Sequence, residues 1–354
     1  MIKNGVRIVL LIVLVVVTID AYNKIEWDRV LPKVDQFITE EKFVLEETVP
    51  DKPVNEEPIE LKGVETWMGE GVSSLKQELG EPDRIDPSSY GYDWWIYEQS
   101  NAAYLQVGIQ EEKVVTVFFM GDIQAGEHYP MGEQKETVFT DRSPTEEVSM
   151  NVKGSVYRFQ LTSEEQSLKP LIKINDELYA QYYFDKFNGK LVAVRLANPQ
   201  VLAVQRPYAV SYRGQLLEAA DLSEEQWVQV QDAREKQVYA MTNVIRHQFE
   251  VASLAYNDDV STVALGHSKD MHDNGYFSHT SPSKGELSDR LKKGDVLYSY
   301  AGENIAARYP DAGAAMIGWL NSKGHREALL NKEFTEIGVG VFREYYTQNF
   351  IKPF

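Results

Sequence analysis

The chain has 354 residues, a formal net charge of -18, 43% hydrophobic residues and no cysteine. The length predicts two domains of roughly 150 residues each, and an acidic chain without clustered Lys and Arg is not expected to bind nucleic acid or anionic lipid headgroups. The lack of cysteine excludes disulfides, thiolate chemistry, iron–sulfur clusters and Cys-ligated zinc.

The N-terminus carries a short apolar segment with a positive flank. Lys3 and Arg7 precede the apolar run 8–19, which Asp20 ends. Because no convincing small-residue cleavage site comes after it, we interpret residues 1–22 as an uncleaved signal anchor that leaves the body outside the cell membrane. The alternatives are secretion after signal cleavage and a buried core helix. Membrane contact is expected through this helix only.

Residues 23–62 are rich in acidic side chains, and three prolines lie near their end. This composition predicts a solvated stalk or linker. Apolar residues at roughly helical spacing within 27–45 also allow a stalk helix next to the membrane.

A first folded domain is predicted at 63–205. It starts with a short helix at 73–79, and runs of aromatic and β-branched residues predict three strands after this helix; the strands are 92–97, 104–109 and 114–120. Two segments recur later in the chain: Met68-Gly69-Glu70 returns as Met131-Gly132-Glu133, and 112–117 parallels 189–194. We therefore expect one α+β domain built from two related halves. Trp94, Trp95 and Tyr97 could form a carbohydrate-stacking face or could alternate between core and surface.

After a linker at 206–222, the pattern changes to helices. Capping signals and apolar stripes predict four helices, at 224–249, 260–274, 286–293 and 312–322. A pair of strands at 337–341 and 345–351 closes the chain, and another strand is expected near 301–305. The predicted fold class is α/β: a C-terminal α/β/α sandwich at 223–354, preceded by a smaller α+β domain and an N-terminal membrane-anchor helix.

Three polar residues in this second domain are placed at the ends of predicted elements, in loops where binding groups are usually presented. His279 and His325 each lie beside small residues, and Glu303 lies between Gly302 and Asn304. Two imidazoles and one carboxylate suit zinc or another divalent cation, with room for water. Alternatively, Glu303 accepts hydrogen bonds and ties distant loops together.

The helical histidines have a simpler interpretation. His267 and His272 are five residues apart on one predicted helix, so their side chains diverge and cannot chelate one ion as an i, i+4 pair could. Each is expected to be a partly buried histidine satisfied by one hydrogen bond.

Residues from about 224 to 354 resemble the bacterial, cysteine-free form of the CAP superfamily (cysteine-rich secretory proteins, antigen 5 and pathogenesis-related 1). The resemblance rests on an ordered series of motif residues: Asn243, Arg246, Leu254, Ala264, His267, Ser268, Asp270, Met271, Gly275, Phe277, Ser278, His279, Asp289, Arg290, Gly302, Glu303, Asn304, Ile305, Trp319, Ser322, Gly324, His325, Arg326, Leu330, Asn331, Phe334, Ile337, Gly338, Val339 and Gly340.

The resemblance implies an α/β/α sandwich with a central cleft that carries two histidines and two acidic residues able to hold a divalent cation. His279, Glu303 and His325 match three of these positions. Ser322 stands where the other acidic residue is expected, three positions after Trp319. The missing carboxylate weakens both metal binding and any two-carboxylate mechanism.

Residues from about 63 to 197 resemble the CAP-associated N-terminal domain found in Gram-positive bacteria. The resemblance rests on the run 79–94, from Leu79-Gly80-Glu81-Pro82 to Trp94, and on Gly108, Lys113 and Val114.

We therefore expect an extracytoplasmic, membrane-anchored module that binds a cell-envelope component: a wall polymer, a lipid or another protein. The alternatives are a metal-assisted hydrolase of peptide or glycan at His279, Glu303 and His325, and a structural spacer. No catalytic residue is assigned, and fold alone does not decide between these functions.

Overall fold

The computed structural model describes residues 59–140 and 143–354. The predicted signal anchor and most of the predicted stalk lie outside the described residues. Within the described ranges, no helix has the length and apolar character needed to cross a membrane.

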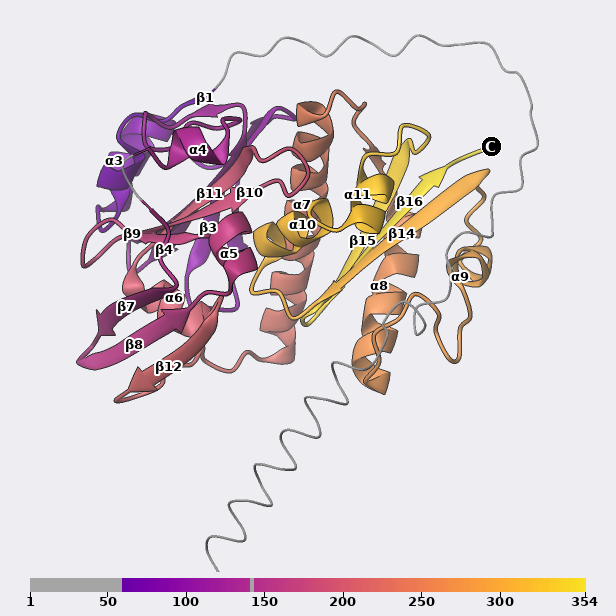
Figure 1. Ribbon diagram of the computed structural model, residues 1–354. Helices are drawn as coiled ribbons and strands as arrows, with labels where there is room; N and C mark the ends of the chain where they lie inside the picture. Colours follow the sequence, from indigo (N-terminus) through magenta and orange to yellow (C-terminus); the bar gives the residue numbers. More distant parts are fainter. Residues whose placement is uncertain (1–58, 141–142) are drawn as a thin grey trace, which may run out of the picture. The chain divides into compact units, whose positions relative to one another are not determined.

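The N-terminal part is mainly β structure (Figure 1). Its central sheet has seven antiparallel strands in the order β2-β3-β4-β5-β11-β10-β9. These strands are β2 (Arg84–Pro87), β3 (Asp93–Ser100), β4 (Ala103–Gln110), β5 (Lys113–Gly121), β9 (Leu171–Lys173), β10 (Tyr179–Phe184) and β11 (Leu191–Ala197). The three strands predicted from the sequence correspond to β3, β4 and β5.

Smaller elements surround this sheet. A three-stranded sheet has the order β12-β8-β7, and a parallel pair joins β1 to β6. These elements are β1 (Ile59–Glu60), η1 (Val64–Trp67), α3 (Val72–Leu79), β6 (Ile123–Gln124), α4 (Lys135–Val138), β7 (Glu147–Val152), β8 (Ser155–Gln160), α5 (Ser163–Leu168), α6 (Pro199–Gln205) and β12 (Ala209–Arg213). Thr162 caps α5 in a capping box with Glu165.

The two predicted halves meet at the centre of the seven-stranded sheet, where β5 pairs with β11. In the first half, the Gly69 N–H donates to Val114 O at 2.9 Å, and the Val114 N–H donates to Glu70 O at 3.0 Å. In the second half the bonds are Gly132 N to Leu191 O and Leu191 N to Glu133 O, both 2.9 Å. The repeated hydrogen bonds confirm the internal repeat.

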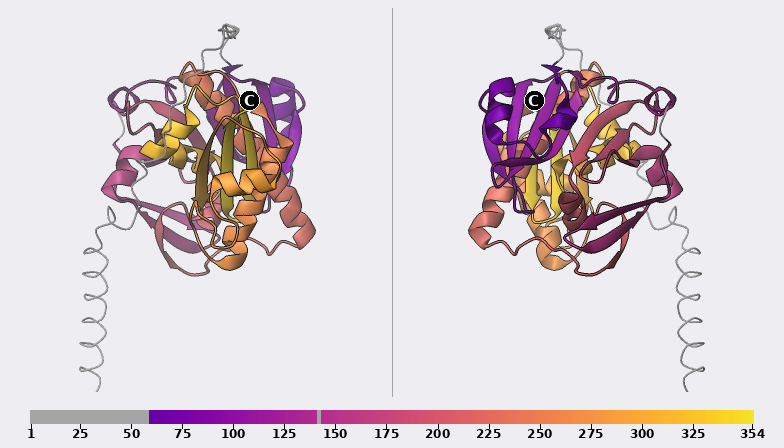
Figure 2. Two further views of the ribbon diagram at one scale, coloured as in Figure 1. Left: turned by 90° about the vertical axis from the view of Figure 1, so that its right-hand side faces the viewer. Right: turned by 90° about the vertical axis from the view of Figure 1, so that its left-hand side faces the viewer.

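The C-terminal part is layered around a four-stranded sheet in the order β13-β15-β16-β14. Its strands are β13 (Ala255–Tyr256), β14 (Tyr300–Ala307), β15 (Glu336–Phe342) and β16 (Tyr345–Lys352). Its helices are α7 (Glu224–Gln248), α8 (Asp258–Asn274), α9 (Leu287–Lys293), α10 (Ala312–Leu320) and α11 (Lys323–Leu329). The left view of Figure 2 shows α8 and α9 in front of the strands, while α7, α10 and α11 lie on the other side in Figure 1. Helices thus cover both faces of the sheet.

Three details of the predicted fold are corrected. The predicted fourth helix, 312–322, corresponds to α10, but a further helix, α11, follows at Lys323–Leu329 and was not predicted. The N-terminal part is the larger one and is mainly β structure. Trp94, Trp95 and Tyr97 are all buried and offer no stacking face, because β3 is an inner strand of a sheet covered on both sides.

The two parts share one hydrophobic core. Tyr92, Trp94 and Phe118 from the N-terminal sheet belong to the same buried cluster as Met241 of α7 and Met316 of α10. At its edge, Arg195 of β11 forms a buried ion pair with Asp311, which caps α10; Nη2 lies 2.8 Å from Oδ1 and Nη1 lies 2.7 Å from Oδ2.

Candidate functional site

Glu303 is the centre of the candidate site. It lies within β14, which β16 pairs along its whole length, and its side chain is only 4% exposed. Its Oε1 lies 2.9 Å from His279 Nδ1, and its Oε2 accepts a hydrogen bond from Arg290 Nη2 at 2.5 Å. The imidazole of buried His267 lies 3.9 Å from Oε1. The buried carboxylate of Glu303 therefore pairs with the guanidinium of Arg290, is bonded to His279 and lies close to His267.

His279 lies in the loop between α8 and α9, and Arg290 fixes this loop as well. Arg290 Nη1 donates to His279 O at 2.8 Å. Asp270 anchors the same loop by accepting hydrogen bonds from Tyr276 and from Ser281, the latter at 2.7 Å. Burial acts to raise the pKa of Asp270, but these hydrogen bonds and Lys284 lower it to about 2, so the anchor stays charged. The His279 side chain itself is 52% exposed and open to a ligand.

His325 lies near His279, with 6.4 Å between the two ring centroids. It lies in the first turn of α11, and Asn304 Nδ2 donates to its carbonyl at 3.1 Å. Burial and the neighbouring His279 lower the pKa of His325 to about 4, so its ring is neutral at neutral pH. Ser322 caps the start of α11 without a side-chain hydrogen bond to the helix.

A hairpin turn of the N-terminal part holds the α10–α11 corner that carries Ser322 and His325. Arg326 Nη1 and Nη2 pair with the two carboxylate oxygens of Asp185 at 3.0 and 2.9 Å. The Arg326 guanidinium also lies over the rings of Phe187 and Phe249, at 4.8 and 4.6 Å from their centroids. Asn321 bonds Lys186 N and Phe184 O at 2.8 and 2.9 Å. The position of His325 thus depends on the β10–β11 turn.

The structure brings His279, Glu303 and His325 together, as the sequence predicted, but only His279 lies in a loop. Glu303 is within strand β14 and His325 is in the first turn of helix α11. Sequence reasoning missed Arg290 and the proximity of His267. Both belong to the motif series of the family resemblance, and that was the signal that could have found them.

The donor set does not fit a divalent cation. Among the residues that the structure describes, no group of three or more His, Asp or Glu side chains could hold a metal ion. Arg290 occupies one oxygen of Glu303, and its buried guanidinium would repel a dication beside it. Ser322 supplies a neutral hydroxyl where a second carboxylate would be needed.

The low pKa of His325 predicts a loss of stability in acid. Between about pH 6.5 and about pH 4, His325 binds a proton in the unfolded chain but stays neutral in the folded chain. The contribution of neutral His325 to the free energy of unfolding is therefore complete above that pH range and is lost as the pH falls through it. Urea unfolding at about pH 7 and about pH 4.5 measures the effect. The free energy of unfolding of the His325→Gln variant should change less between these two pH values than that of the wild type. An exposed control, His128→Gln, should keep the wild-type dependence; equal behaviour of the two variants would refute the assignment.

The layered sheet, with buried Glu303 bonded to His279 and the ring of His325 close to that of His279, defines a CAP-type domain. The chain belongs to the cysteine-rich secretory protein family, although it contains no cysteine. The model described as "Cysteine-rich secretory protein family" matches residues 239–351, and the one described as "CAP-associated N-terminal" matches residues 68–208. Both resemblances predicted from the sequence are confirmed.

Relatives cover almost the whole described chain. YlbC of Bacillus subtilis strain 168, named an uncharacterized membrane protein, is 45% identical over 290 residues, which are 82% of this chain and 84% of YlbC. The crystal structure of an extracellular SCP-domain protein from Bacillus anthracis matches with 39% identity and a TM-score of 0.78, over 89% of this chain and 99% of that one. A cysteine-rich secretory protein from Staphylococcus aureus matches with 27% identity and a TM-score of 0.73, over 84% and 95%.

Proposed function

We propose that this chain is an extracytoplasmic binding module of the cell envelope, and that the cleft of His279, Glu303, Ser322 and His325 holds its ligand. The ligand would be a wall polymer, a lipid or another envelope protein. The N-terminal segment 1–22 would anchor the chain in the membrane, or would be removed on secretion.

The state of Glu303 is the observation that carries this proposal. Its two oxygens are each engaged already, Oε2 by the guanidinium of Arg290 and Oε1 by His279, so the carboxylate is less available as a base or a metal ligand. His279 is exposed, and the ring of His325 is neutral and 6.4 Å away. Two imidazole rings beside a carboxylate that Arg290 already engages suit hydrogen bonding to a ligand better than bond cleavage.

The location is supported by the relatives and by the N-terminal sequence. One relative is named a membrane protein and another is described as extracellular. The positive flank and apolar run of residues 3–19 are typical of a signal that exports the rest of its chain. A metal-assisted hydrolase is the weaker alternative, because the donor set lacks its second carboxylate.

Removal of the imidazoles of His279 and His325 tests the proposal. We expect the full chain carrying His279→Ala and His325→Ala to lose at least about tenfold in affinity for isolated Gram-positive cell envelope, since each lost hydrogen bond contributes about 1 kcal/mol. The measurement is co-sedimentation with the envelope, with circular dichroism as the check on folding. The matched control is His128→Ala with His272→Ala, which removes two exposed imidazoles outside the cleft. Unchanged binding by the cleft variant would refute the assignment of the ligand to this cleft.

A further inference from the structure

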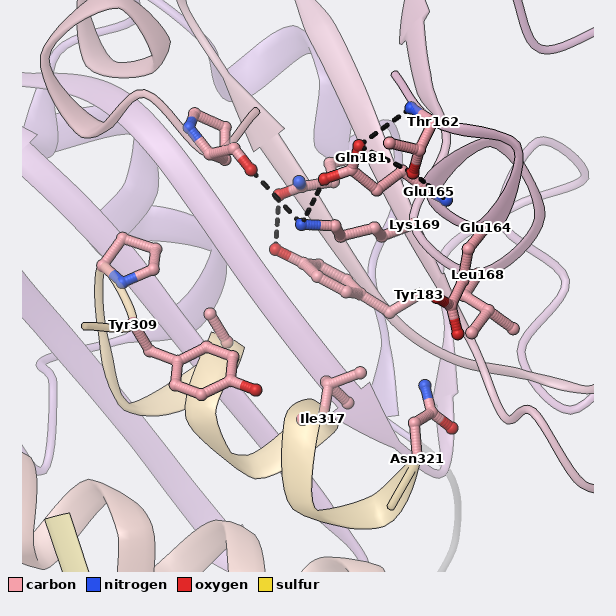
Figure 3. Close-up of a pocket in the computed structure, with 14 residues that line it drawn as sticks. Thr162, Glu164, Glu165, Leu168, Lys169, Gln181, Tyr183, Tyr309, Ile317 and Asn321 are labelled. Atoms are coloured by element: carbon pink, nitrogen blue, oxygen red, sulfur yellow. Dashed lines mark hydrogen bonds and ion pairs between the residues drawn. The ribbon is translucent and has the colours of Figure 1, made fainter. Parts of the chain in front are cut away.

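A pocket of about 380 Å³ lies between the two parts of the chain, away from the histidine cleft (Figure 3). One wall comes from α5 and β10 of the N-terminal part, and the other comes from α10 and the loop before it. In Figure 3, Tyr309, Ile317 and Asn321 lie on one side, facing Thr162, Glu165, Lys169, Gln181 and Tyr183 on the other. Residues from both family regions are needed, so neither region forms this pocket alone.

The apolar part of the pocket contains two tyrosine rings. Tyr309 lies against Gly318, so closely that a Cβ at Gly318 would be 2.2 Å from its hydroxyl oxygen and 2.5 Å from Cζ. Tyr183 lies opposite and donates its hydroxyl hydrogen to Gln181. Leu168, Pro207 and Ile317 complete the apolar lining. A ligand with at least one apolar face is therefore expected.

The charges around the pocket cancel in pairs. Lys169 Nζ lies 3.0 Å from Glu165 Oε1, and Lys186 Nζ lies 2.9 Å from Glu164 Oε1. An anion would meet two carboxylates, and a cation would meet two ammonium groups. This balance favours a ligand without net charge.

Several polar groups in the pocket have hydrogen-bond donors that are not used within the part of the protein that the structure describes. Within residues 59–140 and 143–354, the Tyr309 hydroxyl has no hydrogen-bond partner, and burial raises its pKa so that it remains protonated. Gln181 Nε2 uses one N–H on Tyr208, at 2.6 Å, and keeps the other. Lys169 Nζ contacts Glu165 and Pro207 O, the latter at 3.3 Å, which leaves a third N–H. Free hydrogen-bond donors therefore lie on both walls.

We propose that this pocket binds a neutral sugar unit of a glycan. A hexose ring has an apolar C–H face for a tyrosine ring and oxygen acceptors around its edge for the free donors. The volume of about 380 Å³ is at the lower end of the range for small-molecule sites, about 300–1,000 Å³, and admits one or two sugar rings. The pocket would act independently of the histidine cleft.

Ligand-observed saturation-transfer NMR on the full chain tests this proposal. The probes are N-acetylglucosamine and methyl glucoside, with glucuronic acid as the anionic and glucosamine as the cationic comparison. We expect saturation of the ring C–H protons of both neutral sugars, and binding of the charged sugars at least about tenfold weaker. No transfer to either neutral sugar, or equal binding of the charged sugars, would overturn the proposal.

Two variants place the binding in this pocket. Gly318→Ala must displace the Tyr309 ring and should weaken sugar binding at least about tenfold. Gly266→Ala is the matched control, because it makes the same change within helix α8 where a Cβ meets nothing within 4 Å. Tyr309→Phe keeps the packing, removes only the hydroxyl and should weaken binding several-fold. Full binding by both Gly318→Ala and Tyr309→Phe would refute the site.

The histidine variant separates this proposal from the proposed function. His279→Ala with His325→Ala should bind the neutral sugars like the wild type, whatever its effect on envelope binding. Loss of sugar binding in that variant would show that the sugar occupies the cleft and not this pocket.

Discussion

Gly340→Ala is expected to prevent folding or to lower the free energy of unfolding by more than about 4 kcal/mol. Helix α8 lies directly on strand β15 at this glycine. A Cβ there would be 1.9 Å from Leu265 N and 2.3 Å from both Ala264 C and Leu265 Cα. These are backbone atoms, so no side-chain rotation relieves the overlap, and the whole helix must move away from the sheet. Expression as soluble protein and urea unfolding measure the effect.

The control for this prediction lies on the same helix. Gly266→Ala adds the same methyl group next to Leu265, but into open space. A glycine inside a helix costs roughly 0.5–1 kcal/mol relative to alanine, so this variant should be slightly more stable than the wild type. A Gly340→Ala protein with wild-type stability would mean that the glycine does not set the helix–strand distance.

The second large effect is expected at the buried ion pair between the two parts. Asp311→Ala should lower the free energy of unfolding by about 3–5 kcal/mol, because it leaves the guanidinium of Arg195 buried without its partner. The Arg195 and Asp311 side chains are 1% and 5% exposed. Burial acts to raise the pKa of Asp311, yet Arg195 holds it below its usual value, so the pair stays ionised. Asp311 also caps α10 by accepting from Ala314 N at 3.0 Å.

Two comparisons make this prediction specific. Asp232→Ala breaks an exposed pair with Lys236 at the same N···O distance, 2.7 Å, and should cost less than about 1 kcal/mol. Arg195→Met with Asp311→Asn keeps an acceptor at the helix cap and removes both charges, so it should regain most of the lost stability. An Asp311→Ala protein that loses no more stability than Asp232→Ala would contradict the role given to burial.

Both parts of the chain contribute contacts around the site of His279, Glu303 and His325. Asp185 forms an ion pair with Arg326, and the residue that precedes Arg326 is His325 of the candidate site. The shared core and the Arg195–Asp311 pair fix α10 against the N-terminal sheet. The N-terminal part therefore determines the position of His325 through direct contacts.

The sequence by itself predicted many of the helices and strands and singled out His279, Glu303 and His325. Apolar periodicity predicted β3 to β5 and most helices, and the Met-Gly-Glu repeat predicted two halves that β5 and β11 now join. The caps of α7 and α10, Ser223 and Asp311, are local features too, because their side chains accept hydrogen bonds from N–H groups three residues further on. Such features depend on neighbours in the chain, which a sequence displays.

Only the tertiary structure decided what the site contains besides those three residues. The bond from Arg290 to Glu303 spans 13 residues, and the pair of Arg326 and Asp185 spans 141. The pocket joins α5 to α10 across the boundary between the two family regions. Spacing in the chain does not fix these contacts, because they depend on how closely α8, α10 and the sheets pack, and glycines such as Gly318 and Gly340 set those distances.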